Sequence, residues 1–418
     1  MTLHELNSPA FMSRLAAVYG DAADKQLERF RALAYRFAAE FGEGDLRFFS
    51  APGRTEVGGN HTDHNNGKVL AAAIDLDAVA AVAARSDGVI RVCSEGYAPL
   101  EIDTANLEPL PAETGTSAAL IRGVCARFRE LGYAIGGFNA TVTSRVLSGS
   151  GLSSSAAYEV LICTILNGLY NGGAVNPVTV AQVSQYAENV FFGKPCGLMD
   201  QTACSVGGFV AIDFASTENP QITKVDFDLS VCGHKLCIID TGGNHADLTD
   251  DYAAIRSEMN AVAAFFGKRV LRELPEEQLF ARIDDVRKQT GDRAVERALH
   301  FYNENRRVDR LTAALNNGDF ETFKSIIVES GRSSFMYNQN CFTAVHPTEQ
   351  PVALALCLTE EWLRGKAGYR VHGGGFAGTI QVFLPDELVD DYTAKMRAVF
   401  GENSCYILSV RAHGGCEI

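Results

Sequence analysis

The 418-residue sequence lacks the features that mark secreted, membrane-spanning and disulfide-stabilised proteins. No segment approaches the run of about 18 apolar residues that a transmembrane helix requires. Residues 1–20 show no basic start followed by an apolar stretch, so no signal peptide is expected. The eleven cysteines form no C-x-x-C pair, which favours free thiols over a disulfide framework or a zinc site. We therefore expect a cytoplasmic protein without membrane association.

Positive charge is also scarce, because 37 Lys and Arg residues face 51 Asp and Glu residues and leave a formal charge of −14. Phosphate backbones are held by clustered basic side chains, so this balance argues against a nucleic-acid-binding protein. A small phosphorylated ligand held at one place remains compatible with it. The 46% of hydrophobic residues and the length predict globular domains, with room for two cores.

Three common nucleotide-binding signatures are missing or out of context. The lysine of a Walker A loop is absent, and so are the H-R-D and D-F-G motifs of protein kinases. "GGGFAG" (residues 373–378) matches G-x-G-x-x-G by letter, but the segment after it predicts a strand. A dinucleotide-binding fingerprint opens a helix, so this match predicts a turn between two strands.

The apolar pattern predicts a mixture of helices and strands. Residues 24–42 have helical spacing and end at glycine, and residues 156–170 predict a helix that ends at Asn-Gly-Gly. Several helices are expected within residues 251–332. Strands are expected at 69–85, 88–96, 136–146, 207–214, 222–229, 234–240 and on both sides of the glycine turn in 369–385. The predicted class is α+β in two lobes, divided near 215–230 and taken as domains 1–220 and 221–418.

A glycine- and serine-rich loop, residues 148–155, stands directly before the helix predicted at 156–170. Glycines let backbone N–H groups surround an anion, and the start of a helix adds a favourable dipole. Serine hydroxyls bind phosphate oxygens or Mg²⁺. A serine-capped turn explains the same composition, and the loop alone leaves both interpretations open.

Three segments occur together in the order of the motifs of the GHMP kinases. They are "APGRTEVGGNHTDHNNGKVL" (51–70), "VLSGSGLSSSAAYEV" (146–160) and "RVHGGGFAGTIQVFL" (370–384). Within that superfamily, "AENVFFGKPCGLMDQTACSVGG" (187–208) resembles the galactokinases, and so does G-x-H-T-D near residue 60. The resemblance covers the chain from about residue 28 onward. It implies a two-lobed GHMP kinase fold with the active site in the inter-lobe cleft.

The resemblance also implies an ATP-dependent kinase that phosphorylates the anomeric hydroxyl of galactose. Asp200 would face that hydroxyl, with Arg54 beside it as the second catalytic residue. Mg²⁺ would be held by Glu188 and Ser155, with Ser154 as the neighbouring candidate. The sugar contacts implied are Arg54, Asn60, His61, Asp63, Gly197 and Tyr252. The ATP contacts implied are Ser148, Gly149, Ser150, Gly151, Leu152, Ser153, Ser154 and Ser155.

Phosphoryl transfer to a hydroxyl requires positioning, charge neutralisation and an acceptor for one proton. An ionised Asp200 can accept that proton, and the charge of Arg54 favours its ionised form. Each residue also has a local alternative. Asp200 fits a helix N-cap, Glu188 a solvated helix residue and Arg54 a structural ion pair. "HTDH" (61–64) resembles metal ligands, although these side chains are too close together to surround one ion unaided.

Two positions depart from the galactokinase pattern at the sugar site. Galactokinases usually have glutamate at the position of Asn60, where it meets the hydroxyl on carbon 6, and tyrosine at that of His64. Glu56 likewise stands where the family tends to have asparagine, and "HPTEQ" (346–350) replaces C-P-E-L-D. Asparagine is neutral and both donates and accepts hydrogen bonds.

These departures allow a second acceptor, a uronic acid such as galacturonate. A glutamate would repel its carboxylate by about 4 kcal/mol at ~4 Å and an effective dielectric of ~20. Asn60 removes that repulsion, and a protonated His64 would attract the acid. A non-catalytic sugar sensor on the same fold is a third alternative, but the intact phosphate loop and Asp200 favour an enzyme. Small-molecule sugar and ATP are the expected partners, and the sequence does not predict an oligomeric state.

Overall fold

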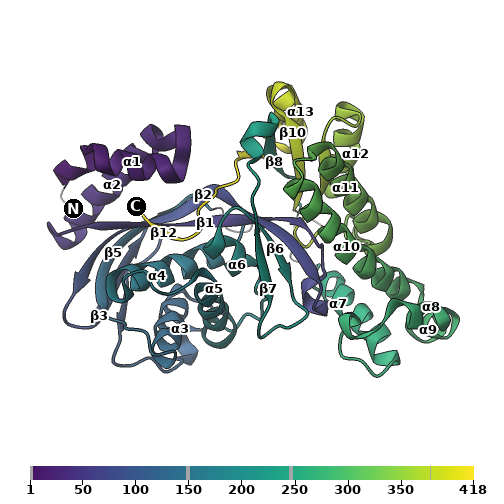
Figure 1. Cartoon of the computed structure of the whole chain (residues 1–418), viewed down its shortest axis with the longest axis horizontal. Coiled ribbons are helices and arrows are strands. Elements are labelled where there is room, and N and C mark those ends of the chain that lie inside the picture. Colours follow the sequence, from purple (N-terminus) through teal and green to yellow (C-terminus); the bar gives the residue numbers. More distant parts are fainter. Residues whose placement is uncertain (1–2, 147–150, 244–247, 377) are drawn as a thin grey trace. The chain divides into compact units, whose positions relative to one another are not determined.

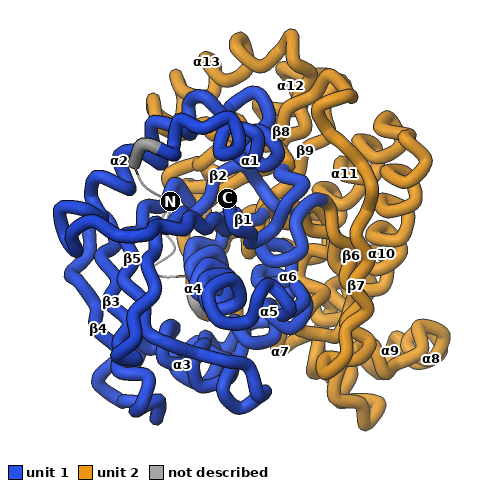
Figure 2. Tube along the Cα trace, turned by 60° about the vertical axis from the view of Figure 1, so that its left-hand side comes forward, with its two compact units in different colours: residues 1–54, 73–208, 411–418 blue, residues 55–72, 209–410 orange. Residues whose placement is uncertain are grey.

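The computed structural model describes residues 3–146, 151–243, 248–376 and 378–418 (Figure 1). Its residues form two compact units, each assembled from separate stretches of chain (Figure 2). Unit 1 comprises Met1–Arg54, Ala73–Gly208 and Arg411–Ile418, and unit 2 comprises Thr55–Ala72 and Phe209–Val410. The units differ from the contiguous domains expected at 1–220 and 221–418, because strands β1 (Arg47–Gly58) and β2 (Lys68–Arg85) each pass from one unit into the other.

Unit 1 is a sheet with helices on both faces, as its part of Figure 1 shows. Its sheet has the order β12-β1-β2-β5-β3-β4, in which β3 and β5 are parallel and β2 and β5 antiparallel. The remaining elements of this unit are α1 (Pro9–Tyr19), α2 (Ala23–Phe41), β3 (Val89–Ser94), β4 (Leu100–Asp103), α3 (Ser117–Glu130), β5 (Gly137–Ser144), α4 (Ser154–Asn171), α5 (Pro177–Tyr186), α6 (Met199–Val206) and β12 (Cys416–Glu417).

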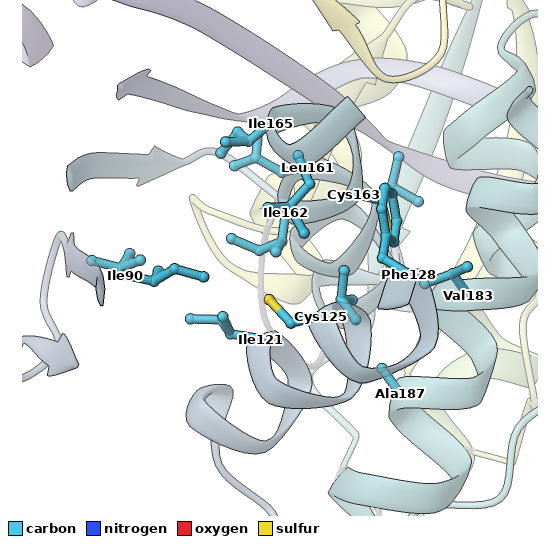
Figure 3. Packing of buried hydrophobic residues seen from close by; sticks show 14 of the residues in the cluster. Ile90, Ile121, Cys125, Phe128, Leu161, Ile162, Cys163, Ile165, Val183 and Ala187 are labelled. Carbon is cyan, nitrogen blue, oxygen red and sulfur yellow. The ribbon is translucent and has the colours of Figure 1, made fainter. Parts of the chain in front are cut away.

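The side chains of β2 point alternately to the two faces of the sheet, and this explains why helices cover both faces. Ala78, Ala80 and Val82 belong to the core cluster beneath α3, α4 and α5, whereas Val79 and Ala81 belong to the cluster beneath α1 and α2. Successive side chains of a strand point to opposite faces, so a continuous apolar run can fill both clusters. Figure 3 shows side chains of the first cluster from close by. The strand expected at residues 69–85 is thereby confirmed.

A buried ionic network joins distant segments of unit 1 around Asp77. Its Oδ1 lies 2.5 Å from Nη1 of Arg29, and its Oδ2 lies 2.9 Å from Nη1 of Arg411. Oδ2 also accepts hydrogen bonds from the hydroxyls of Tyr19 at 2.6 Å and Ser50 at 2.5 Å. Burial alone would raise the pKa of Asp77, but the two arginines hold it below its ordinary value.

Unit 2 contains a four-stranded antiparallel sheet of order β11-β8-β10-β9 and a set of helices. Residues 68–72 of β2 pair antiparallel with β6, which pairs with β7. The elements of unit 2 are β6 (Phe209–Asp213), β7 (Gln221–Val225), β8 (His234–Asp240), α7 (Thr249–Phe265), α8 (Glu276–Ala281), α9 (Ile283–Thr290), α10 (Asp292–Asn316), α11 (Phe320–Ser333), α12 (Pro351–Leu363), β9 (Gly368–His372), β10 (Thr379–Pro385), α13 (Val389–Phe400) and β11 (Cys405–Leu408).

Two cores stabilise unit 2. One lies between the four-stranded sheet and helices α12 and α13, and the other joins helices α7 to α10. The antiparallel pairing of β9 with β10 brings His372 opposite Thr379, so the described residues of "GGGFAG" lie between two paired strands, as the sequence predicted. All eleven cysteines are free. Within the described ranges, no helix combines the length and apolarity that a membrane crossing would need.

Candidate active site

The end of the glycine-serine loop joins helix α4 through a strained residue. Ser153 directly precedes the helix and has a left-handed φ of 61°, a conformation that costs a residue other than glycine free energy and is often found at functional sites. Its hydroxyl does not cap the helix but donates a hydrogen bond to the Asp200 carboxylate. The predicted ATP contacts Ser148, Gly149 and Ser150 lie outside the described residues.

Strand β1 lies against this loop because it carries glycine at residue 53. A Cβ there would lie 2.8 Å from the carbonyl oxygen of Leu152 and 2.9 Å from the side chain of Val146. The next residue, Arg54, donates its backbone N–H to the same Leu152 oxygen at 3.1 Å. Because Gly53 has no side chain, strand β1 can approach Leu152 closely, and this approach sets the position of the Arg54 backbone from which the guanidinium extends.

Arg54 and Asp200 form a two-point ion pair in unit 1. Nε of Arg54 lies 2.8 Å from Oδ1 of Asp200, and Nη2 lies 2.8 Å from Oδ2. Nη1 donates to the carbonyl oxygen of Gly151, so one guanidinium joins the loop to the carboxylate. The side chain of Arg54 is 10% exposed and that of Asp200 is 33% exposed, which leaves the carboxylate accessible from one side.

The surroundings of Asp200 keep it ionised. Burial would raise its pKa, but the charge of Arg54 and the hydrogen bonds from Arg54 and Ser153 lower the pKa below the ordinary value. Asp200 lies in the first turn of α6, where the helix dipole also favours a negative charge. The capping position of α6 belongs to Leu198, so the N-cap alternative considered for Asp200 is wrong.

Glu188 lies in a π-helical turn, Ala187–Phe192, and is 2% exposed. Its Oε1 accepts a hydrogen bond from Oγ of Ser155 at 3.1 Å, and Lys194 approaches the same oxygen at 3.3 Å. Its Oε2 accepts from Nε2 of Gln201 at 2.8 Å. The alternative of a solvated helix residue is therefore wrong, because Glu188 is buried and bonded to the first turn of α4.

Sequence reasoning missed the second carboxylate at this place. Glu159, one turn after Ser155 on α4, is fully buried, and its Oε2 accepts from Nε2 of Gln201 at 3.2 Å. Burial and the charge of Glu188 raise the pKa of Glu159 well above its ordinary value. Residues four positions apart lie on one face of a helix, so the sequence could have placed Glu159 beside Ser155.

In unit 2, the glycine turn between β9 and β10 is held through its carbonyl oxygens. Asn60 donates Nδ2 to Gly373 O at 2.8 Å, Nε2 of His61 lies 2.8 Å from Gly374 O, and Tyr252 donates its hydroxyl to Gly375 O at 2.7 Å. Three predicted sugar contacts thus meet at one turn. Asn60 itself is fully buried, which differs from the exposed position expected of a sugar contact.

The other predicted sugar contacts are more open. Asp63 is half-buried in a 3-10 turn of unit 2, and Gly197 is exposed in unit 1, three residues before Asp200. His64 lies 3.4 Å from His61 between ring nitrogens, and burial lowers its pKa to about 4. His64 is therefore neutral near pH 7, which removes the attraction for a uronate that a protonated ring would supply.

Each of the three sequence motifs contains a residue other than glycine with positive φ. These residues are His61 and Asn66 (59° each) in the first motif, Ser153 (61°) in the second and Phe376 (57°) in the third. Such strain persists where the surrounding contacts require it, and it concentrates at ligand-binding segments. Among the described residues, no group of three or more His, Cys, Asp or Glu side chains is spaced to hold a metal ion.

Two parts of the sequence match known family profiles, and the fold matches solved structures. A family profile described as "Galactokinase galactose-binding signature" matches residues 35–84, and one described as "GHMP kinases N terminal domain" matches residues 119–208. A crystal structure of Lactococcus lactis galactokinase complexed with galactose superposes with a TM-score of 0.78 at 23% identity, covering 93% of this chain and 100% of that one. Methanococcus jannaschii mevalonate kinase superposes with a TM-score of 0.62 at 13% identity, covering 88% and 99%. The fold is that of the GHMP kinases.

Two curated relatives identify the family within the GHMP kinases. Galactokinase of Streptomyces coelicolor is 34% identical over 372 residues, which cover 87% of this chain and 91% of the relative. Galactokinase of Homo sapiens is 33% identical over 394 residues, covering 90% and 94%. The chain belongs to the galactokinase family.

Proposed function

We propose that this chain is an ATP-dependent kinase that transfers the γ-phosphoryl group of ATP to the anomeric hydroxyl of galactose. The observation that carries the proposal is the ion pair of Asp200 with Arg54, which also reaches the end of the glycine-serine loop through Gly151 and Ser153. Family membership supplies the substrates, because the relatives that share most of its length are galactokinases.

The proposed chemistry follows from the charge state of Asp200. The anomeric O–H gives its proton to the ionised carboxylate while its oxygen forms a bond to the γ-phosphorus and the bond to the β-phosphate oxygen breaks, which releases ADP. Arg54 holds the carboxylate in place by two hydrogen bonds and contributes positive charge beside the transferred group. We assign binding of ATP phosphates to the loop of residues 148–155.

The residues present suit a magnesium ion carried with ATP. Mg²⁺ is bound by one or two protein oxygen ligands together with substrate phosphates, and Oγ of Ser155 lies 3.1 Å from Oε1 of Glu188. These two oxygens are our candidate ligands, and Ser154 starts the same helix. When bound, the ion would neutralise phosphate charge during transfer. Lys194 lies near the same carboxylate and adds positive charge there.

For the sugar, we propose contacts from His61, Asp63, Gly197, Tyr252 and Arg54. His61 and Tyr252 both lie at the glycine turn, and Asp63 is a half-buried carboxylate suited to accept hydrogen bonds from hydroxyls. The uronate alternative is not favoured, since His64 is neutral near pH 7. The sensor alternative is not favoured either, because the Asp200–Arg54 pair is complete.

The proposal is tested by ATP consumption with galactose, N-acetylgalactosamine, galacturonate, glucuronate and arabinose at equal concentrations. We expect kcat/KM to be highest for galactose by at least about tenfold over either uronate. A higher value for galacturonate would overturn the assignment of the acceptor. No ATP consumption with any of the five sugars, in protein shown to be folded, would overturn the assignment of an enzyme.

A further inference from the structure

Glu56 and Asn60 form a buried acid–amide pair in unit 2. Glu56 is near the end of β1 and Asn60 follows that strand by two residues. Oε1 of Glu56 accepts a hydrogen bond from Nδ2 of Asn60 at 3.0 Å and another from Nη2 of Arg370 at 2.8 Å. Glu56 is 6% exposed, and Asn60 and Arg370 are fully buried. The charge of the acid is therefore balanced inside the protein by a guanidinium, and an amide donates a further hydrogen bond to it.

The amide of Asn60 has no hydrogen-bonding position left for a ligand. Its Nδ2 donates to Glu56 and to the carbonyl oxygen of Gly373, and its Oδ1 accepts from Oγ of Ser334 at 3.1 Å and Nδ2 of Asn340 at 2.9 Å. An asparagine side chain has two donors and two acceptor positions, and protein groups occupy all four.

An acid at residue 60 is incompatible with these partners. A carboxylate only accepts hydrogen bonds, so at this position it would face the Glu56 carboxylate and the Gly373 carbonyl oxygen without a proton between them. The identity of residue 60 thus depends on that of residue 56. The two departures from the family pattern, glutamate at 56 and asparagine at 60, are then one exchange of an acid and an amide between neighbouring positions.

Asn60 holds the same turn that His61 and Tyr252 contact. His61 and Asn340 both reach the carbonyl oxygen of Gly374, the latter at 3.1 Å, and Tyr252 reaches Gly375. A Cβ on Gly374 would collide with the ring of Tyr252, so this turn and that ring are closely fitted. A shift of Asn60 would therefore displace both proposed sugar contacts.

We propose that Glu56 and Asn60 act as one positioning unit for the sugar-binding residues, and that residue 60 does not contact the sugar. No ionised side chain at residue 60 then recognises the group on carbon 6 of the acceptor. This inference rests on the proposed function. It implies that the specificity for the sugar depends less on the hydroxyl on carbon 6 than it would with a glutamate at residue 60. Galactose lacking it, 6-deoxygalactose, becomes a substrate with a kcat/KM within about tenfold of galactose.

The first test is a double-mutant cycle in thermal unfolding, measured on the full chain without substrate. Glu56→Asn leaves Arg370 without its acid, and Asn60→Glu brings two acids together. Each single variant should lower the Tm by roughly 5–10 °C, and the double variant should recover more than half of the summed loss. The matched control is Glu329→Asn, which breaks the surface pair with Arg310 and should shift the Tm by no more than ~2 °C. If the losses of Tm in the two single variants simply add in the double variant, the proposal that Glu56 and Asn60 act together is overturned.

The second test separates positioning from sugar contact by kinetics. Asn60→Ala should raise the KM for galactose and for 6-deoxygalactose by the same factor, with the KM for ATP unchanged. A merely structural loss would lower the active fraction and leave all KM values in place. A parent enzyme that prefers galactose by more than about 100-fold, with the preference lost in Asn60→Ala, would show direct contact and overturn the proposal. Failure of the proposed function would abolish turnover in the parent but leave the unfolding cycle unaffected.

Discussion

Replacing Asp200 by asparagine tests the proposed chemistry with little change in shape. The carboxylate receives two hydrogen bonds from Arg54 at 2.8 Å and one from Ser153. An amide cannot take the proton of the sugar hydroxyl, and its NH₂ group would face a donor. Proton transfer by a positioned group contributes about 10²–10⁴ in rate, which corresponds to roughly 3–5 kcal/mol of barrier. We expect kcat to fall by that factor.

The assay follows ADP release at saturating ATP and galactose, and calorimetry measures ATP binding separately. We expect the affinity for ATP to stay within about threefold, because Asp200 is bonded to Ser153 in the described part of the loop, and Arg54 links it to Gly151. Asp309→Asn is the matched control, since Asp309 pairs with Lys68 at 2.7 Å with its side chain 60% exposed. That variant should keep turnover within about twofold.

Two results would refute this reasoning. A kcat within tenfold of the parent would show that Asp200 neither accepts the proton nor positions the hydroxyl. A parallel loss of turnover and ATP binding would show that the variant disturbs the loop through Arg54, and that the rate effect does not report on proton transfer. Unfolding of the variant by heat distinguishes that second result from general loss of structure.

Glu188→Gln should raise the Mg²⁺ concentration for half-maximal activity by at least tenfold, read from titrations at fixed ATP, whereas an unchanged midpoint would remove Glu188 from the ligand set. Asp77→Asn leaves Arg29 and Arg411 unpaired and should cost about 3–5 kcal/mol of unfolding free energy at pH 7, measured by urea denaturation. The folded pKa of Asp77 lies below the unfolded value near 3.9, so its contribution to the free energy of unfolding is present above about pH 4 and is lost as the pH falls through the folded pKa. If the difference in unfolding free energy between parent and variant grows on acidification, this prediction is wrong. Gly53→Ala should lower kcat at least tenfold by pushing strand β1 from the loop, and full activity would contradict the close approach.

Much of the fold follows from local pattern. The helix expected at residues 24–42 is α2, which ends at Gly42 with a φ of 83°, and the helix that ends at Asn-Gly-Gly is α4, with Gly172 in the left-handed conformation. The strands on both sides of the glycine turn are β9 and β10. These elements carry their own start and stop signals, so a single sequence is sufficient to find them.

Contacts between residues that are distant in the sequence could not be predicted from the sequence alone. The alternation that fills two cores from one strand predicts burial but not which helices cover each face. Glu56 had no physical explanation in the sequence, because its guanidinium partner Arg370 is 314 residues away. The same limit applies to Asn60: its residue type suggested a ligand contact, whereas its four hydrogen bonds are made within the protein. Motif spacing locates segments, but the pairing of their side chains depends on tertiary contacts.

The division of the chain into interleaved units bears on how the protein is made. Most of unit 1 precedes Phe209–Val410 of unit 2 in the sequence, yet unit 1 also includes Arg411–Ile418, which follow that segment. Strand β12 and one of the two guanidinium groups that neutralise Asp77 belong to this later stretch. Until residues 411–418 are synthesised, the nascent unit holds a buried acid with one of its two counter-charges missing and a sheet with an unpaired edge at β1, a state exposed to aggregation. Deletion of residues 411–418 is therefore expected to impair the folding of unit 1, although most of that unit is encoded more than 200 residues earlier.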